Sequence, residues 1–191
     1  MKTLLLMRHA KSSWKFPDLP DHERPLNKRG RRDAPLMGKF LQDRDLVPQR
    51  IISSTAARAR QTAEALAESA NYRGDIVYLE KLYMAEVEEY INTLHDLPDD
   101  LDRVLVIGHN PGMETLLQVI SHRIESLPTA VVAHIDVPID QWNQFNGQTT
   151  GEIVEIWRPK DVRVEVEEEE REKAKAKGKA KDKGKSSKKD K

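Results

Sequence analysis

Short apolar runs alternate along this chain with segments whose apolar residues recur at helical spacing, and this alternation restricts the fold more than any other feature. Strands are predicted at 4–7, 50–53, 75–79, 103–108, 130–137 and 151–157, and helices at 27–43, 57–70, 86–97 and 113–121. Strands that alternate with helices predict an α/β fold, a three-layer α/β/α arrangement with a mainly parallel central sheet. The last two strands have no helix between them, so we expect an antiparallel pair at one edge.

The first strand ends at Arg8 and His9. In open α/β sheets ligands bind at the carboxyl ends of the strands. A guanidinium holds phosphate oxygens through paired hydrogen bonds, and a neutral imidazole can attack phosphorus as a nucleophile. The pair therefore favours a phosphoryl site, although an Arg-His pair after an apolar run is also typical of an ordinary surface turn.

Arg58 lies in the first turn of the second predicted helix, for which Ser54 or Thr55 is the expected N-cap. A cation is disfavoured there because the helix dipole is positive at its N-terminus. An anion bound at the same place would remove the conflict, since helix N-termini bind phosphate. Arg58 is thus a second indication of an anion site.

His109 follows the most apolar strand of the chain and precedes a helix, which repeats the position of His9. The proline-containing segment 12–25 directly follows the first strand and its motif. It is either one wall of the site or a loop whose aromatic residues cover the core.

Composition narrows the classes of function. The chain has no cysteine, which excludes disulfides, thiolate metal sites and cysteine nucleophiles and fits a reducing cytoplasm. No third ligand accompanies His9 or His109, so we expect neither a metal nor another cofactor. No apolar run is long enough to span a membrane, and we expect a cytoplasmic protein with no membrane partner.

The formal net charge of the chain is zero, but the distribution of charged residues changes near residue 160. An acidic run at 165–170 is followed by 173–191, which holds ten Lys against two Asp and no apolar residue larger than Ala. Such a segment cannot bury a core. We expect a catalytic domain at 1–160 and a disordered Lys-rich tail at 161–191 that binds polyanions weakly and without sequence specificity, or only aids solubility.

Four motifs in this order resemble those of the histidine phosphatase superfamily, the phosphoglycerate-mutase-like group, and most closely its small SixA-type phosphohistidine phosphatases. They are Leu6-Met7-Arg8-His9-Ala10-Lys11-Ser12, Arg24-Pro25-Leu26 with Gly30, Ser53-Ser54-Thr55-Ala56-Ala57-Arg58-Ala59, and Val106-Ile107-Gly108-His109-Asn110-Pro111-Gly112. The resemblance covers residues 1–159 and implies the fold of that superfamily. Ala10 replaces the Gly that many members have after the catalytic His, a variation that the SixA branch tolerates.

The resemblance implies that His9 is the nucleophile and forms a phosphohistidine intermediate that water hydrolyses. It implies that Arg8, Arg58 and His109 bind the phosphoryl oxygens. Larger relatives use an acidic residue after the third strand as a proton donor, for which Glu86 is the candidate here, with Glu88 or Glu89 behind it; Glu86 is equally well explained as a residue that opens a helix.

The expected function is hydrolysis of a phosphoryl group, with a phosphohistidine-bearing signalling or phosphotransfer protein as the substrate. The chain lacks the long insertions of sugar-phosphate mutases, which suggests an open site. Two alternatives stand beside this one: a phosphomonoesterase for small molecules that uses the same site, and a non-catalytic module that binds phosphate or phosphoproteins.

Overall fold

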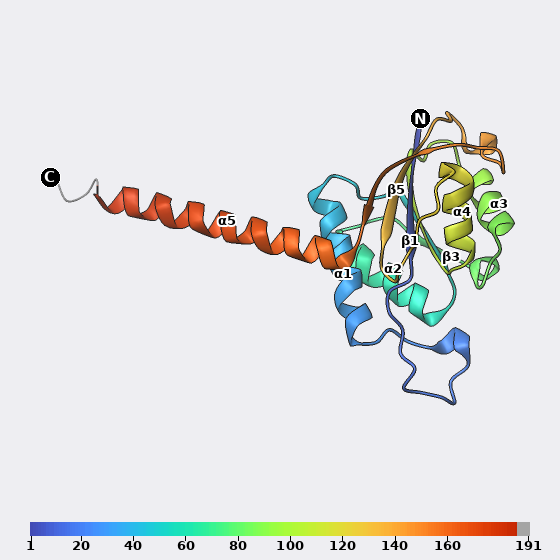
Figure 1. Ribbon diagram of the computed structural model, residues 1–191, viewed down its shortest axis with the longest axis horizontal. Coiled ribbons are helices and arrows are strands. Elements are labelled where there is room, and N and C mark those ends of the chain that lie inside the picture. The colour runs from blue at the N-terminus through green and yellow to red at the C-terminus, as the bar shows by residue number, and fades with distance from the viewer. Residues whose placement is uncertain (187–191) are drawn as a thin grey trace. The chain divides into compact units, whose positions relative to one another are not determined.

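The computed structural model describes residues 1–186, and residues 1–159 form one compact unit. This unit is built on one six-stranded sheet in the order β3-β2-β4-β1-β5-β6 (Figure 1). The strands are β1 (Lys2–Arg8), β2 (Arg50–Ser54), β3 (Ile76–Leu79), β4 (Arg103–Gly108), β5 (Val132–Val137) and β6 (Glu152–Trp157). β1 to β4 pair in parallel, whereas β5 runs antiparallel to both β1 and β6. The mainly parallel sheet and the antiparallel last pair are confirmed.

Helices cover both faces of the sheet, as the strand and helix alternation predicted (Figure 1). They are α1 (Lys28–Asp43) and α2 (Ala57–Ser69), which pack against each other on one face, and α3 (Val87–His95) and α4 (Gly112–Ser121) on the other. Leu4 and Leu6 of β1 belong to the apolar cluster that includes α3 and α4. The alternation of side chains along a strand turns Leu5 and Met7 to the opposite face, where they are fully buried.

The pairing register of the parallel strands determines which residues lie together at the edge of the sheet where these strands end. Arg8 at the end of β1 lies opposite Gly108 at the end of β4, and Ser53 of β2 lies opposite Ile107. The three neighbouring parallel strands therefore end at the same level. The residues that follow them, His9 and His109 among them, emerge at one edge.

The start of α1 packs closely against the chain that leaves β1. Asn27 is its N-cap, as predicted, and its side chain accepts a hydrogen bond from the Gly30 N–H. A Cβ at Gly30 would lie 2.3 Å from the Lys11 carbonyl oxygen, so only glycine permits this approach. Asn27 also donates its backbone N–H to that carbonyl at 2.9 Å. The segment after His9 is thereby fixed.

The N-cap predicted for α2 differs from the structure. The capping position is occupied by Ala56, with no side-chain hydrogen bond to the helix. Ser54 and Thr55 have other partners: Ser54 contacts His109, and Thr55 contacts His22 and Glu80. Neither hydroxyl caps a first-turn N–H of α2, although Ser54 Oγ accepts a hydrogen bond from the N–H of the N-cap residue, Ala56, at 3.3 Å.

The segment from residue 160 is a second unit. The composition of residues 161–191 predicted disorder, but the structure describes Pro159–Ser186 as one helix, α5; residues 187–191 lie outside the described part. Ala, Glu, Lys and Arg have high helix propensity, and acidic residues precede basic ones, as the helix dipole favours. Glu167 and Arg171 form an i,i+4 ion pair. Within residues 1–186 no helix has both the length and the apolar composition that crossing a bilayer requires.

Candidate active site

The shared edge of β1, β2 and β4 opens into a cavity of about 290 Å³. It contains all four residues that the motifs predicted to meet. Its lining consists of Arg8, His9, Lys11, Ser12, Trp14, Asp21, Arg24, Arg58, Met84, His109, Asn110 and Thr129. Segment 12–25 contributes four of these residues, so of its two interpretations the wall of the site is the one that the structure supports.

His9 is buried and held in a defined orientation. Its backbone N–H donates a hydrogen bond to the Gly108 carbonyl at 3.1 Å, which extends the pairing of β1 with β4 by one residue. Its Nδ1 lies 2.8 Å from the Ala10 carbonyl oxygen, which can only accept, so Nδ1 carries the proton. The lone pair of the neutral ring is then on Nε2, which lies 3.3 Å from Arg58 Nε. Nε2 is thus the ring nitrogen that carries a lone pair, and it accepts a long hydrogen bond from Arg58 Nε.

Burial and three cations keep this imidazole neutral. Loss of solvation lowers the pKa of His9 most, Arg58, Arg8 and Arg24 lower it further, and the Ala10 carbonyl opposes them; the result is a pKa of about 4. At neutral pH the His9 imidazole therefore carries no second proton, and no base is needed to expose its lone pair.

His109 lies next to His9, with 5.0 Å between the ring centroids. Its Nε2 is 2.9 Å from Ser54 Oγ, and that oxygen accepts a hydrogen bond from the Ala56 N–H. The Ser54 hydroxyl can therefore donate to Nε2 and place the ring proton on Nδ1. Nδ1 is buried and has no hydrogen-bond partner among the described residues. Burial, then the charges of His9 and Arg58, lower the pKa of His109 to about 3.

Tyr90 of α3 fixes the backbone of His109. The His109 N–H donates to the Tyr90 hydroxyl at 3.1 Å. A Cβ at Gly108 would lie 2.2 Å from that hydroxyl, and one at Gly112 would lie 2.9 Å from the ring. The two glycines thus allow a fully buried tyrosine to approach the end of β4. The sequence placed Tyr90 on the apolar face of its helix but gave no sign of this contact.

Arg58 is 2% exposed and is held by a residue that the sequence did not single out, Asp21. Arg58 donates from Nη1 to the Asp21 backbone carbonyl at 2.7 Å and from Nη2 to its carboxylate at 3.0 Å. The carboxylate also accepts from the Tyr83 hydroxyl at 2.9 Å and pairs with Arg24 at 2.9 Å. Burial raises the pKa of Asp21, but Tyr83, Arg58 and Arg24 outweigh it, so this pKa is lowered and the carboxylate is ionised.

Four buried donors of the lining residues lack a hydrogen-bond partner among the described residues: Arg8 Nε, Arg24 Nε, Arg24 Nη1 and His109 Nδ1. Arg24 Nε is ion-paired with Asp21, which leaves the other three donors without a partner in the part of the chain that the structure describes. Each buried donor left without a partner costs about 1–3 kcal/mol. A single anion with several oxygens could accept from all three. The donor set therefore suits a phosphoryl group, which has three such oxygens.

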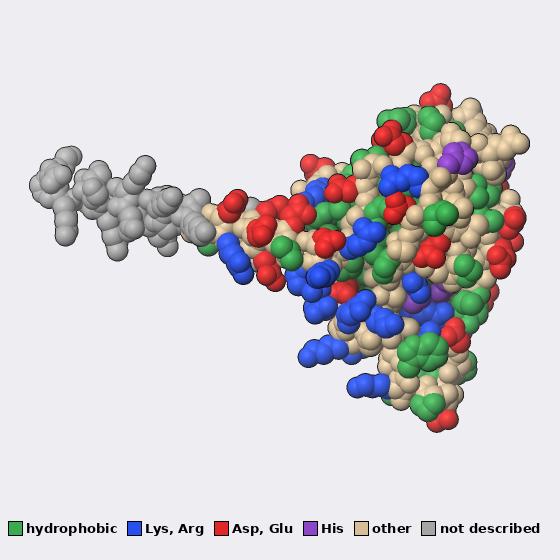
Figure 2. Space-filling model, in the orientation of Figure 1, with side chains coloured by type: hydrophobic (Ala, Val, Ile, Leu, Met, Phe, Trp, Pro, Cys, Tyr) green, Lys and Arg blue, Asp and Glu red, His purple; other side chains and the backbone are tan. Residues whose placement is uncertain are grey.

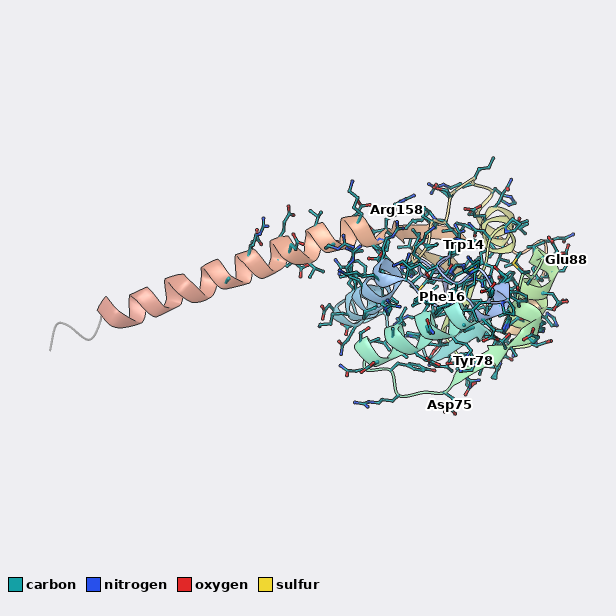
Figure 3. The ribbon with its side chains drawn as sticks, turned by 90° about the horizontal axis from the view of Figure 1, so that it is seen from below. Trp14, Phe16, Asp75, Tyr78, Glu88 and Arg158 are labelled. Atoms are coloured by element: carbon teal, nitrogen blue, oxygen red, sulfur yellow. The ribbon has the colours of Figure 1, made fainter. Side chains whose placement is uncertain are left out.

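Glu86 is not brought into the cavity. It is exposed at the N-cap position of α3, and Glu88 and Glu89 follow in the first turn of that helix. Figure 3 shows Glu88 on α3 well apart from Trp14, which lines the cavity. Asp21 is the one carboxylate of the lining within the described residues. It comes from a segment with no periodic pattern, which is why sequence reasoning missed it.

Comparisons with known proteins agree with this chemistry. Residues 4–83 match the model of the histidine phosphatase superfamily (branch 1). The chain is 38% identical over 116 residues to an uncharacterized protein of Mycobacterium tuberculosis, which covers 60% of this chain and 70% of that protein. It is 29% identical over 153 residues to an uncharacterized chloroplastic protein of Arabidopsis thaliana, which covers 75% of this chain and 70% of that one.

Two solved structures have the same fold. One is a candidate phosphohistidine phosphatase SixA from Agrobacterium tumefaciens, with a TM-score of 0.72 and 30% identity over 83% of this chain and 98% of that chain. The other is a candidate SixA from Nakamurella multipartitia, with a TM-score of 0.74 and 25% identity over 83% of this chain and 96% of that chain. Fold and site define a phosphatase, a hydrolase that acts on a phosphorylated substrate. The chain belongs to the histidine phosphatase superfamily, in its SixA-like branch.

Residues 1–186 contain no group of three or more His, Cys, Asp or Glu side chains placed to hold a metal ion. The cavity instead gathers three guanidiniums, those of Arg8, Arg24 and Arg58, around one imidazole. Fixed cations of this kind stabilise the charge that builds up on a transferring phosphoryl group.

Proposed function

We propose that this protein is a phosphohistidine phosphatase that removes the phosphoryl group from a histidine of another protein, with His9 as the nucleophile. The observation that carries the proposal is the neutral His9 imidazole, whose Nε2 lies beside the Arg58 guanidinium. Phosphoryl transfer needs positioning and countercharge more than covalent chemistry from the enzyme.

In the first step the lone pair of His9 Nε2 forms a bond to phosphorus while the P–N bond of the substrate breaks. During this step Arg8, Arg58 and His109 donate hydrogen bonds to the phosphoryl oxygens. The substrate imidazole leaves as a neutral ring because its other nitrogen carries a proton. In the second step water attacks the phosphorus of phospho-His9 and the P–Nε2 bond breaks. The protons of the water leave with inorganic phosphate, and the imidazole, which keeps its Nδ1 proton, returns to its neutral form.

The ionised Asp21 favours a phosphohistidine over a phosphate ester as the substrate. An alkoxide leaving group departs slowly unless an acid protonates it. The carboxyl group at this cavity has a lowered pKa and therefore holds no proton at neutral pH. An imidazole needs no such acid. A small-molecule phosphomonoesterase is the competing function that the following experiment separates from this one.

The experiment measures turnover on a panel: a histidine-phosphorylated protein, free phosphohistidine, and two alkyl phosphate esters, phosphoserine and glycerol 3-phosphate. We expect both phosphohistidine substrates to be hydrolysed with the higher kcat/KM. Quenching within milliseconds should trap labelled phosphate that is acid-labile and alkali-stable, on His9. The His9→Ala variant should lose both signals, whereas His122→Asn, at an exposed histidine after α4, should keep both. A preference for the esters, or turnover that survives in His9→Ala, would contradict the proposal.

A further inference from the structure

Large apolar side chains are exposed around the mouth of the cavity. Among the described residues eight large hydrophobic side chains are exposed. Four of them, Trp14, Phe16, Leu19 and Met84, come from the two segments that border the cavity, with 73%, 53%, 41% and 57% of their surface exposed. Single exposed apolar residues are normal in proteins, but several beside one functional site indicate a contact surface.

The loop that carries three of them is anchored at its base. The Ser13 N–H donates to the Pro25 carbonyl at 2.8 Å, next to an antiparallel bridge between Ser12 and Leu26. Arg24 stacks on Trp14, with Cζ 3.5 Å from the ring centroid. Trp14 and Phe16 are labelled on this loop in Figure 3. The apolar tip is thus held outside the core by a fixed base, which lowers the entropy that binding would cost.

The outer part of this surface is too far from the chemistry to serve a small substrate. Trp14 and Met84 line the cavity, but Phe16 and Leu19 do not. A molecule that fits within about 290 Å³ would be held by the lining residues. Phe16 and Leu19 can be covered only by something larger that extends out of the cavity. A folded protein that carries the phosphoryl group on its surface meets this requirement.

Cationic side chains lie on this loop and at its base. Lys15 lies between Trp14 and Phe16 and is exposed, and Lys28 and Arg29 are exposed in the first turn of α1. Arg29 reaches the cavity wall through a 3.1 Å hydrogen bond to Thr129. Figure 2 shows Lys and Arg side chains next to hydrophobic ones at this end of the compact unit. Asp18 and Glu23 offset part of the charge, and Asp33 pairs with Arg29 at 3.4 Å. Lys15 and Lys28 remain as exposed cations, so the complementary surface of a partner is an apolar patch with an acidic rim.

We propose that Trp14, Phe16, Leu19 and Met84, with Lys15 and the first turn of α1, form a docking surface for a folded phosphoprotein whose apolar contact patch has an acidic rim. This inference rests on the proposed function and specifies how its substrate is selected. The cavity acts on the phosphoryl group, and the docking surface recognises the protein that carries it.

The test compares kcat/KM on a histidine-phosphorylated protein with kcat/KM on free phosphohistidine. The variant is the double substitution Phe16→Ser with Leu19→Ser, because neither residue lines the cavity. The matched control is Ile124→Ser with Val154→Ser, two exposed apolar residues that are not on the bordering segments. We expect the variant to lose roughly 10- to 100-fold on the phosphoprotein, mainly through KM, and less than about twofold on free phosphohistidine. The control should change neither value.

Binding without turnover gives a second measurement. The His9→Ala protein should bind the phosphoprotein by calorimetry, and adding Phe16→Ser with Leu19→Ser should weaken that binding by a similar factor. The phosphoprotein reaction should also slow as salt rises, more than the reaction with free phosphohistidine. An unchanged ratio of the two kcat/KM values in the variant, or an equal fall on both substrates, would overturn the docking surface alone. A wild-type protein inactive on both phosphohistidine substrates would overturn the proposed function, and the docking surface with it.

Discussion

The two buried histidines make the stability of the protein depend on pH in a way that can be calculated. His9 and His109 have pKa values of about 4 and about 3, against 6.5 for an ordinary histidine. Between the folded and unfolded values the unfolded chain binds a proton at each position and the folded chain does not. The stability that they contribute is therefore fully present above about pH 6.5 and is lost as the pH falls toward 4.

The magnitude follows from proton linkage. A group that is protonated only in the unfolded chain changes the free energy of unfolding by about 1.4 kcal/mol per pH unit. From pH 6 to pH 5 most unfolded histidines are protonated, so each of the two contributes about 1 kcal/mol. We expect the pair to lower the free energy of unfolding by about 2 kcal/mol over this unit, a large part of the 5–15 kcal/mol typical of a domain.

The assay is urea unfolding followed by fluorescence of the buried Trp142 and Trp157 at pH 5, 5.5 and 6. The His9→Gln variant should reduce the change per pH unit by about 1 kcal/mol relative to wild type. The substitution His122→Asn controls for the replacement of a histidine outside the cavity. If His9→Gln and wild type show the same pH slope, the His9 imidazole is not held neutral by its surroundings, and the argument that it attacks without a base is wrong.

Four further predictions concern individual parts of the site. Arg58→Lys should lower kcat/KM for phosphohistidine by roughly 10²–10³, because one charged amine cannot replace the guanidinium donors; a loss below tenfold would refute this. Ser54→Ala should lower kcat about two- to tenfold by releasing the His109 tautomer, with recovery in Ser54→Thr, and an unrestored Thr variant would indicate a packing effect. Asp21→Asn should raise KM because it loosens Arg58, whereas Glu86→Gln should keep wild-type kinetics. If Glu86→Gln lost activity and Asp21→Asn did not, Glu86 would be supported as the proton donor. Turnover should survive EDTA, and rescue of a chelated enzyme by a divalent ion would contradict this.

The sheet and the four central residues of the site were accessible to sequence reasoning for a physical reason. Buried parallel strands are continuous apolar runs, so the places where they end are visible, and Arg8, His9 and His109 stand at those places. Arg58 stood out because its charge opposes the helix dipole. In each case the signal is local: it depends on residues adjacent in the chain.

The missed features are contacts between distant segments. Asp21 contacts Arg58 and Tyr83, which are 37 and 62 positions away in the sequence. Ser54 and His109 are in contact although 55 positions separate them. No periodicity records such contacts, because an irregular loop can place a side chain anywhere within its reach. The segment after residue 160 shows a different limit. A lack of large apolar residues indicates that no core can form, but it does not argue against a helix such as α5.

The anchoring of the loop at Ser12 and Leu26 has a consequence for how this enzyme can change over evolutionary time. The bridge closes the loop at its base, while His9 is fixed separately by the ladder to Gly108 in the middle of the sheet. Residues such as Phe16 and Leu19 can therefore be exchanged without moving His9. Asp21 and Arg24 of the same loop line the cavity and would have to be kept, because Asp21 holds Arg58. The exposed tip is the part that can vary, so exchanging Phe16 and Leu19 for the corresponding residues of a relative should transfer partner choice.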